Sequence, residues 1–504
     1  MHTADLFYNG KSLFEMDSLE KVIHPSAFER TKDKEGSLHT WYCEVDSATT
    51  TIWANFQGGN PNKSVTELSI RRTCFYPDKP WVNYITIRGF EISQAASQWA
   101  APTAEQIGMV ATHWNKGWII EDNIIHDSKA SGITLGKERS TGHNVWSNDP
   151  SYEGALHYIE VIFRVLRKGW SKENIGSHIV RNNIIYNCEQ AGICGSFGAA
   201  FSRFEHNHIY QIHQKKQFTG AEMGGIKLHA AVDVVLVHNR IHDSGAFGFW
   251  LDWLAQGTRV SKNLLYRNDW NDMFFEVDHG PYLVDNNIML SSQSLRNQSE
   301  GGAYVHNLIG GSVGILTEPN RYTPYLLPHA TDVAGLSTVL GGDDRYYNNI
   351  FVIQDQLRDQ KGVYGISSYF KKTDFRGPSH TRWPSDRWPV AIDHNAYYIG
   401  VSPHPDEKDF VEESNFNPNY QIIENSNDVY LQFSTDASLS RLSTPYITSG
   451  FLGEVKLPKE GYTQPDGTAL QIDTDFLGKK RDTVQPTAGP FEKPAPGIIR
   501  IKVW

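Results

Sequence analysis

Two carboxylates stand at equivalent positions of a repeated segment. Asp252 lies thirteen residues after Asn239, and Glu276 lies thirteen residues after Asn263. If the two asparagines mark the same turn of successive coils, the carboxylates lie side by side on strands about 4.8 Å apart. Retaining glycosidases hold two carboxyl groups about 5–5.5 Å apart, whereas inverting enzymes need about 6.5–9.5 Å. The spacing therefore predicts a glycosidase pair with the retaining geometry.

The side chains around each carboxylate suggest different roles for the two groups. Two like charges this close do not both ionise easily, so one pKa rises and that group can donate a proton near neutral pH. Glu276 follows two phenylalanines and has the longer reach, which suits a general acid/base. Asp252 has the shorter side chain, which suits a nucleophile. Registered acidic pairs also bind calcium in β-helical lyases, so a calcium-dependent polysaccharide lyase and a non-catalytic glycan-binding protein remain alternatives.

Further polar and aromatic side chains are predicted around this pair. His229 follows the strand at 225–228 as Asp252 follows the strand at 248–251, which places His229 one coil before Asp252. Glu222 is near in sequence and could bind a sugar hydroxyl or orient His229. Three more candidates border the site by register or loop position, with simple packing as the other interpretation: Trp253, Trp99 and His279.

The elements that must position these residues come from a repeat. A tetrad of a polar residue, Asn, a variable residue and an apolar residue occurs nine times, with Asn at 123, 183, 207, 239, 263, 287, 307, 349 and 395. The central intervals are 24, 32, 24, 24 and 20 residues, and the flanking ones of 60, 42 and 46 leave room for inserted loops. A period in the low twenties with short strands is typical of a solenoid.

Each repeat reads as three strands and two turns. Asn at a fixed turn can stack into a ladder of amides and tolerates the left-handed conformation of sharp turns. The second turn is predicted at Asp127-Ser128 and Asp243-Ser244, and a third strand follows it, as at 132–135 and 225–228. The predicted fold is all-β: a right-handed parallel β-helix with an attached antiparallel β-sandwich-like region.

The predicted regions differ in pattern. Residues 1–82 contain alternating β-type runs separated by Gly, Asn and Pro turns, which predicts the β-sandwich-like region. Residues 83–401 carry the repeats of the β-helix core, with a loop excursion near 139–174 that contains a helical piece. Residues 402–504 are richer in Pro, Asp, Asn and Ser, which predicts the end of the β-helix and an irregular extension.

Composition excludes several classes of function. The net charge is −10 and there is no long basic run, which argues against nucleic-acid binding. No apolar run approaches the roughly 18 residues of a membrane span, and no signal peptide is visible, so a cytoplasmic location is expected. The four cysteines have no metal-site spacing. Neither a metal nor a cofactor is expected, while 14 Trp, 23 Tyr and 24 Phe suit a carbohydrate binder.

Long motifs resemble the β-xylosidases of glycoside hydrolase family 120. They are QWAAPTAEQ at 98–106, GIKLHAA at 225–231, WLDWLAQGTR at 250–259, FEVDHGP at 275–281 and GGDDRYYNN at 341–349. The resemblance implies a parallel β-helix with a β-sandwich, and a retaining exo-β-D-xylosidase that releases xylose from the non-reducing end of short xylo-oligosaccharides. It implies Asp252 as nucleophile, Glu276 as acid/base and Glu222 as a further acidic residue of the site.

The resemblance has one departure. Family members begin with several more coils before the sandwich, whereas this chain starts at the sandwich itself. An uncapped solenoid end exposes apolar surface. Three explanations stay open at this point: the sequence is a fragment, its reading frame starts at the wrong place, or a second copy of the chain or a partner chain covers the N-terminal end.

Overall fold

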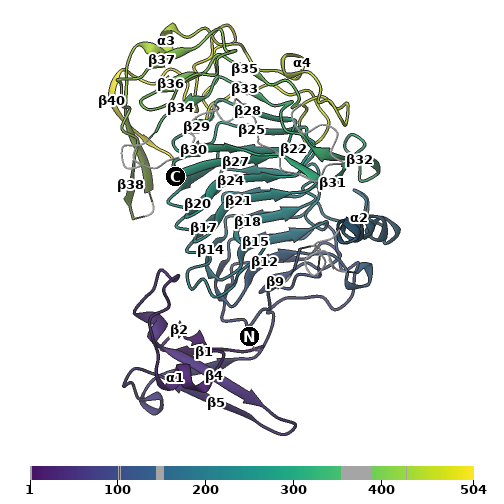
Figure 1. Ribbon diagram of the computed structural model, residues 1–504, viewed down its shortest axis with the longest axis vertical. Coiled ribbons are helices and arrows are strands. Elements are labelled where there is room, and N and C mark those ends of the chain that lie inside the picture. The colour runs from purple at the N-terminus through teal and green to yellow at the C-terminus, as the bar shows by residue number, and fades with distance from the viewer. Residues whose placement is uncertain (1–2, 100, 103, 143–151, 354–386, 427) are drawn as a thin grey trace.

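The computed structural model describes all residues except 1–2, 100, 103, 143–151, 354–386 and 427 (Figure 1). Three parallel sheets wind around one apolar core, which confirms the predicted parallel β-helix. The first, of eight strands, contains β9 (Val110–Ala111), β12 (Ser131–Leu135), β15 (Ala191–Ser196), β18 (Gly224–His229), β21 (Phe247–Asp252), β24 (Asn271–Glu276), β27 (Gln293–Gln298) and β30 (Ser312–Ile315).

The other two parallel sheets complete each coil. The ten-stranded sheet contains β7 (Thr86–Arg88), β10 (Ile119–Glu121), β13 (Ile179–Arg181), β16 (Arg203–Glu205), β19 (Val235–Val237), β22 (Thr258–Ser261), β25 (Tyr282–Asp285), β28 (Gly302–Val305), β33 (Arg345–Tyr347) and β35 (Ala391–Asp393). The eleven-stranded sheet contains β8 (Glu91–Ser93), β11 (Ile124–Ser128), β14 (Ile184–Cys188), β17 (His208–Tyr210), β20 (Arg240–His242), β23 (Leu264–Tyr266), β26 (Ile288–Met289), β29 (Leu308–Ile309), β34 (Ile350–Phe351), β36 (Ala396–Tyr398) and β37 (Val411–Glu413).

The nine repeated asparagines form the predicted ladder. All are buried, and the Asn123 amide donates to the Asn183 side-chain oxygen at 3.0 Å. The same bond continues from coil to coil at 2.9–3.1 Å and ends where Asn395 donates to Glu407 at 2.9 Å. A buried amide is costly unless it is hydrogen-bonded. The ladder therefore sets the register of every strand that follows it.

The left-handed residue of this turn is not the asparagine, as the sequence had suggested, but the residue before it. Asp122 has φ 57° and His238 has φ 52°, and the preceding residue is left-handed in all nine tetrads. The physical reason is that the ladder needs each Asn side chain directed inward along the stack, so its neighbour turns the chain. The second turn follows the prediction, with Asp127 at φ 58° and Asp243 at φ 52°.

The N-terminal region forms two small sheets beside the first coils (Figure 1). One contains β1 (Asp5–Tyr8), β2 (Lys11–Ser12) and β6 (Thr66–Ser69), all antiparallel. The other contains β3 (Phe14–Glu15), β4 (Thr40–Val45) and β5 (Thr50–Asn55), of which β3 and β4 pair in parallel. The helix α1 (Leu19–Ile23) and the 3₁₀ turns η1 (Gly36–Leu38) and η2 (Pro61–Lys63) connect them. The first bridge to the β-helix joins Phe75 and Val110.

Two excursions lie beside the coils that carry the acidic pair. The first holds the 3₁₀ turn η3 (Arg139–Thr141) and α2 (Tyr152–Arg167), at the position where the sequence predicted a helical piece. The second is the antiparallel hairpin of β31 (Glu318–Leu326) and β32 (Val333–Val339). Val161 of α2, Leu326 of the hairpin and Trp253 belong to one buried cluster. The hairpin is thus held next to the turn that follows β21.

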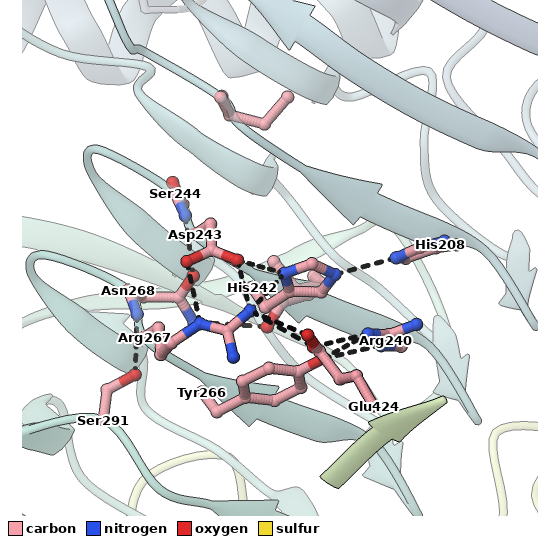
Figure 2. Close-up of polar contacts among 12 residues, drawn as sticks. His208, Arg240, His242, Asp243, Ser244, Tyr266, Arg267, Asn268, Ser291 and Glu424 are labelled. Atoms are coloured by element: carbon pink, nitrogen blue, oxygen red, sulfur yellow. Dashed lines mark hydrogen bonds and ion pairs between the residues drawn. The ribbon is translucent and has the colours of Figure 1, made fainter. Parts of the chain in front are cut away.

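The C-terminal region packs on the outer faces of two sheets, with its own antiparallel sheet on the eleven-stranded sheet and residues 447–472 on the ten-stranded sheet. It contains α3 (Ser438–Arg441), α4 (Ser449–Leu452) and an antiparallel sheet of β38 (Gln421–Asn425), β39 (Asp428–Thr435) and β40 (Gly497–Lys502). Glu424 of β38 accepts hydrogen bonds from Arg240 at 2.8 Å and from Tyr266 at 2.5 Å. Figure 2 shows these side chains directed at one another. Within the described residues, no helix is long and apolar enough to cross a membrane.

Candidate active site

The predicted register of the acidic pair is confirmed. Asp252 ends β21 and Glu276 ends β24, and the two are direct partners across the parallel strands. His229, the last residue of β18, is the partner of Asp252 on the preceding coil. Because alternate residues of a strand share one face, these three side chains form a column on the outer face of the eight-stranded sheet. The Glu276 side chain is 20% exposed and that of Asp252 only 7%.

A buried lysine, which the sequence analysis did not single out, lies at the centre of the site. Lys227 lies two residues before His229 on the same face of β18, and its side chain is fully buried. Its Nζ donates to Asp252 Oδ2 at 2.8 Å and lies 3.4 Å from Glu222 Oε1. It also lies 4.4 Å from the ring centre of Trp250, a cation–π contact. One cation is therefore within ion-pair distance of two buried carboxylates.

Glu222 is directed at the histidine. Its Oε1 lies 2.6 Å from His229 Nε2, and its Oε2 accepts from Gln106 at 3.3 Å and from Cys194 Sγ at 3.2 Å. Glu222 is fully buried at φ 67°. Of the two roles considered for Glu222, the geometry matches the orientation of His229.

Glu276 is held by groups from two different elements. Trp250 Nε1, one coil earlier, donates to Glu276 Oε2 at 2.9 Å. Arg321 of the β31–β32 hairpin lies 3.9 Å from Glu276 Oε1. The tryptophan positions the carboxyl group without neutralising it, which leaves it able to carry a proton.

The two carboxylates have opposite pKa shifts. Burial, and then the negative charge of Asp252, raise the pKa of Glu276 to about 7. Burial also raises the pKa of Asp252, but the charges of Lys227 and His229 outweigh it and hold that pKa below its ordinary value. At neutral pH the pair thus combines an ionised Asp252 with a Glu276 poised to give or take a proton. This division agrees with the roles expected from side-chain length.

One oxygen of Asp252 is available for chemistry. Lys227 binds Oδ2, whereas Oδ1 is buried and has no hydrogen-bond partner among the described residues. A buried, ionised oxygen without a partner is costly and is often found where a reacting group binds. Asp252 therefore has one oxygen paired with Lys227 and one oxygen without a hydrogen-bond partner among the described residues.

The two aromatic candidates for substrate contact, Trp99 and Trp253, lie in different surroundings. Trp99 is partly exposed, and its Nε1 donates to the carbonyl oxygen of Ala221 at 3.3 Å, next to Glu222. Trp253 is fully buried and meets the His229 ring edge-on, with ring centres 6.2 Å apart. The left-handed turn after β21 (φ 62°) directs the Trp253 indole into a buried cluster, and its contact with a sugar stays a prediction.

His279 is buried and makes polar contacts with two neighbouring elements, and its contact with a sugar stays a prediction. Its Nδ1 lies 2.7 Å from Glu300 and its Nε2 lies 2.9 Å from the Thr323 hydroxyl of the hairpin. The side chain is 1% exposed. It therefore connects the coil after Glu276 to the hairpin that carries Arg321.

Sequence reasoning missed three residues of the site for two different reasons. Lys227 and Trp250 occupy one column, two residues before the acidic column, so alternation along the strands could have found them. Arg321 comes from a hairpin outside the repeat. Its approach to Glu276 depends on tertiary packing, and no repeat spacing encodes it.

Comparisons with known proteins agree with this geometry. Residues 1–68 match the family model for the glycoside hydrolase 120 insertion domain, and residues 165–310 match that for the right-handed β-helix region. A solved structure described as XylC in complex with xylose is 43% identical, with a TM-score of 0.91. That alignment covers 100% of this chain and 81% of XylC. No curated protein sequence matches.

More distant solved structures share little with the chain. The pectate lyase Pel9A is 9% identical with a TM-score of 0.32, over 56% of this chain and 66% of that one. The alginate epimerase AlgG is 11% identical with a TM-score of 0.29, over 66% of this chain and 70% of that one. The likeness to these two structures indicates nothing about the function of this chain. The insertion domain, the β-helix and the close match to XylC together show that this chain belongs to glycoside hydrolase family 120.

Proposed function

We propose that this protein is an exo-acting β-D-xylosidase that releases xylose from the non-reducing end of short xylo-oligosaccharides with retention of configuration. The observation that carries the proposal is the Asp252–Glu276 pair, in register on adjacent strands and with opposite pKa shifts. The xylose bound to XylC, which is 43% identical over this whole chain, supports xylose as the sugar. Adjacent strands lie about 4.8 Å apart, close to the spacing of retaining enzymes.

The proposed reaction has two displacements. Asp252 Oδ1 attacks the anomeric carbon, the glycosidic bond breaks, and Glu276 gives its proton to the leaving oxygen. The product is a xylosyl ester of Asp252. Glu276, now a carboxylate, takes a proton from water as the water oxygen bonds to the anomeric carbon and the ester bond breaks. Two inversions give net retention, and Glu276 is protonated again.

The stereochemistry of the first product tests this proposal. We expect an aryl β-xyloside to give β-xylose first, seen by proton NMR before mutarotation, and aryl β-glucosides to react far more slowly. α-Xylose as the first product would overturn the retaining mechanism. Absence of turnover, with binding of xylose preserved, would instead favour a non-catalytic glycan-binding protein.

The calcium-dependent lyase alternative is not favoured by a specific observation. Lys227 already lies between Asp252 and Glu222 as their positive partner. In the described residues, the cluster with metal-ligand spacing is Asp393, His394 and Asp409, at the end of β35 and in loops, and it contains neither member of the acidic pair.

Replacing Lys227 with methionine should move the acid limb of the pH profile to higher pH. The ammonium group stabilises ionised Asp252, so its loss raises the folded-state pKa of that carboxyl and removes the reactive form at low pH. Removing one partner of a buried ion pair costs about 3–5 kcal/mol, and we expect kcat/KM at pH 6 to fall by about 10²-fold. Kinetics over a pH series, with thermal unfolding alongside, measures both effects.

The surface variant Lys502→Met provides the matched control, because Lys502 pairs with Asp428 on an exposed strand. This variant should have the same pH profile of kcat/KM as the parent enzyme. An acid limb that stays in place in a folded Lys227→Met enzyme would show that Lys227 does not set the ionisation of Asp252.

A further inference from the structure

The β31–β32 hairpin has a bulge where it approaches Glu276. The register of the two strands shifts between Glu318 and Thr323, so β31 contains extra residues there that β32 lacks. Bulges of this kind re-aim side chains and are common next to active sites. Arg321 lies within the bulge, and its Nη1 is 3.9 Å from Glu276 Oε1. The bulge therefore brings a cation from outside the repeat to the carboxyl group of Glu276.

A chain of buried polar contacts fixes one end of this bulge. Thr323, the first paired residue after the bulge, is fully buried, and its hydroxyl lies 2.9 Å from His279 Nε2. His279 Nδ1 lies 2.7 Å from Glu300 Oε1. Glu300 Oε2 in turn accepts a hydrogen bond from the backbone N–H of Leu340, just past β32, at 3.2 Å. Both strands of the hairpin are thus attached to the turns that follow β24 and β27.

The other end of the bulge is attached less firmly. Glu318 Oε1 accepts from the backbone N–H of Asn320 at 3.2 Å, a contact within the bulge itself. Glu318 Oε2 accepts from Gln298, the strand partner of Glu276 on the following coil, at 3.5 Å. Because a hydrogen bond weakens as it lengthens beyond about 3.2 Å, the contact between Thr323 and His279 is the stronger attachment of the bulge to the β-helix.

The charges that act on Glu276 come from the β-helix and from the hairpin. They belong to Lys227 of β18, Asp252 of β21, Arg296 of β27, Asp278 in the turn after β24, and Arg321. Burial and Asp252 raise the pKa of Glu276 to about 7, and Arg321 opposes this rise more strongly than Lys227 does. Strand register fixes the positions of Lys227 and Arg296. That of Arg321 depends instead on how the bulge is held.

We propose that Thr323 and His279 are positioning residues, whose contact holds the β31 bulge so that Arg321 stays beside Glu276. This inference rests on the proposed function, in which Glu276 gives and takes the proton, and it assigns residues that control this step through Arg321. Loss of the Thr323 hydroxyl frees the end of the bulge and lets Arg321 move away from the carboxyl group.

The pH profile of kcat/KM for xylobiose tests this arrangement. Thr323→Val keeps the shape of the side chain and removes the hydroxyl. With Arg321 displaced, the pKa of Glu276 rises and the carboxyl group keeps its proton to higher pH. The alkaline limb should therefore move up by about one pH unit, the order expected when a charge about 4 Å away is lost. Arg321→Met should give the same shift, and Thr323→Ser, which keeps the hydroxyl, should restore the parent profile.

Thr331→Val is the matched control. Thr331 is also buried, but it lies at the turn of the hairpin, where its hydroxyl donates to the carbonyl oxygen of Trp170 at 2.8 Å. This variant should have the parent profile. In an Arg321→Met background, Thr323→Val should add no further shift, because the cation that the contact positions is already gone.

Thermal unfolding establishes which variants are folded. His279→Asn keeps a partner for Glu300 but does not reach Thr323, and it replaces Thr323→Val if that variant does not fold. An alkaline limb that stays in place in the folded variant, that moves equally in Thr331→Val, or that moves further in the Arg321→Met background would overturn the positioning role.

The proposed function fails separately, if the parent enzyme hydrolyses no xyloside. A carbon-13 NMR titration of the glutamate side chains, with Glu276 assigned from Glu276→Gln, then decides the positioning role. A higher titration midpoint of Glu276 in Thr323→Val than in the parent protein supports it, and an equal midpoint refutes it.

Discussion

Replacement of Asp252 by alanine should lower kcat/KM for an aryl β-xyloside by about 10⁴-fold or more, as expected when a nucleophile is removed. The Oδ1 atom that lacks a hydrogen-bond partner is lost, and no other described carboxylate is the strand partner of Glu276 on that side. Azide should restore part of the rate and yield α-xylosyl azide. The small anion fits the space left by the Asp252 side chain and attacks the anomeric carbon in a single displacement, which inverts the configuration. Product NMR identifies this anomer.

The control for this variant is Asp466→Ala, which removes an exposed carboxylate from a C-terminal turn. It should retain the parent rate and show no response to azide. Near-normal hydrolysis by a folded Asp252→Ala enzyme would refute the nucleophile assignment. A rescued product with the β configuration would place the nucleophile elsewhere in the site.

Replacement of Glu276 by alanine should lower kcat/KM for xylobiose by about 10²–10⁴-fold, the usual contribution of a general acid. Xylosides with good leaving groups need less protonation of the leaving oxygen. For these substrates the rate of the first displacement should fall much less. Azide should now give β-xylosyl azide, because the xylosyl ester on Asp252 forms and is then attacked from the opposite face. The two variants thus predict opposite anomers.

The pH profile provides an independent test of Glu276. Its carboxyl must be protonated to act as an acid, and burial together with Asp252 raises its pKa to about 7. The kcat/KM of the parent enzyme should therefore fall as pH rises through about 7, and the Glu276→Ala variant should lack this alkaline limb. On the acid side, the proposed mechanism needs Asp252 ionised, and because its pKa is lowered we expect activity to be lost only at a pH below the ordinary pKa of an aspartate. An alkaline limb that persists in Glu276→Ala would assign the acid to another group.

Much of the fold could be predicted from local sequence because the β-helix is a one-dimensional repeat. Each Asn of the ladder needs the next one for its hydrogen bond, so the spacing from Asn239 to Asn263 carries the register to distant residues. The left-handed residue of each turn is the one before the asparagine. The pattern marks where a turn occurs but does not show which residue carries the left-handed conformation.

The sequence by itself determined that Asp252 and Glu276 are neighbours, since equal distances from two ladder asparagines lead to equal positions on adjacent strands. Only the tertiary structure decided their chemical environment. Arg321 arrives on a hairpin outside the repeat, and Trp253 and His279 turn inward to support the site. Buried Lys227 pairs with Asp252 and helps to hold the pKa of that member of the pair low. Register follows from spacing along the chain, whereas solvent exclusion and charge compensation depend on what packs over each strand.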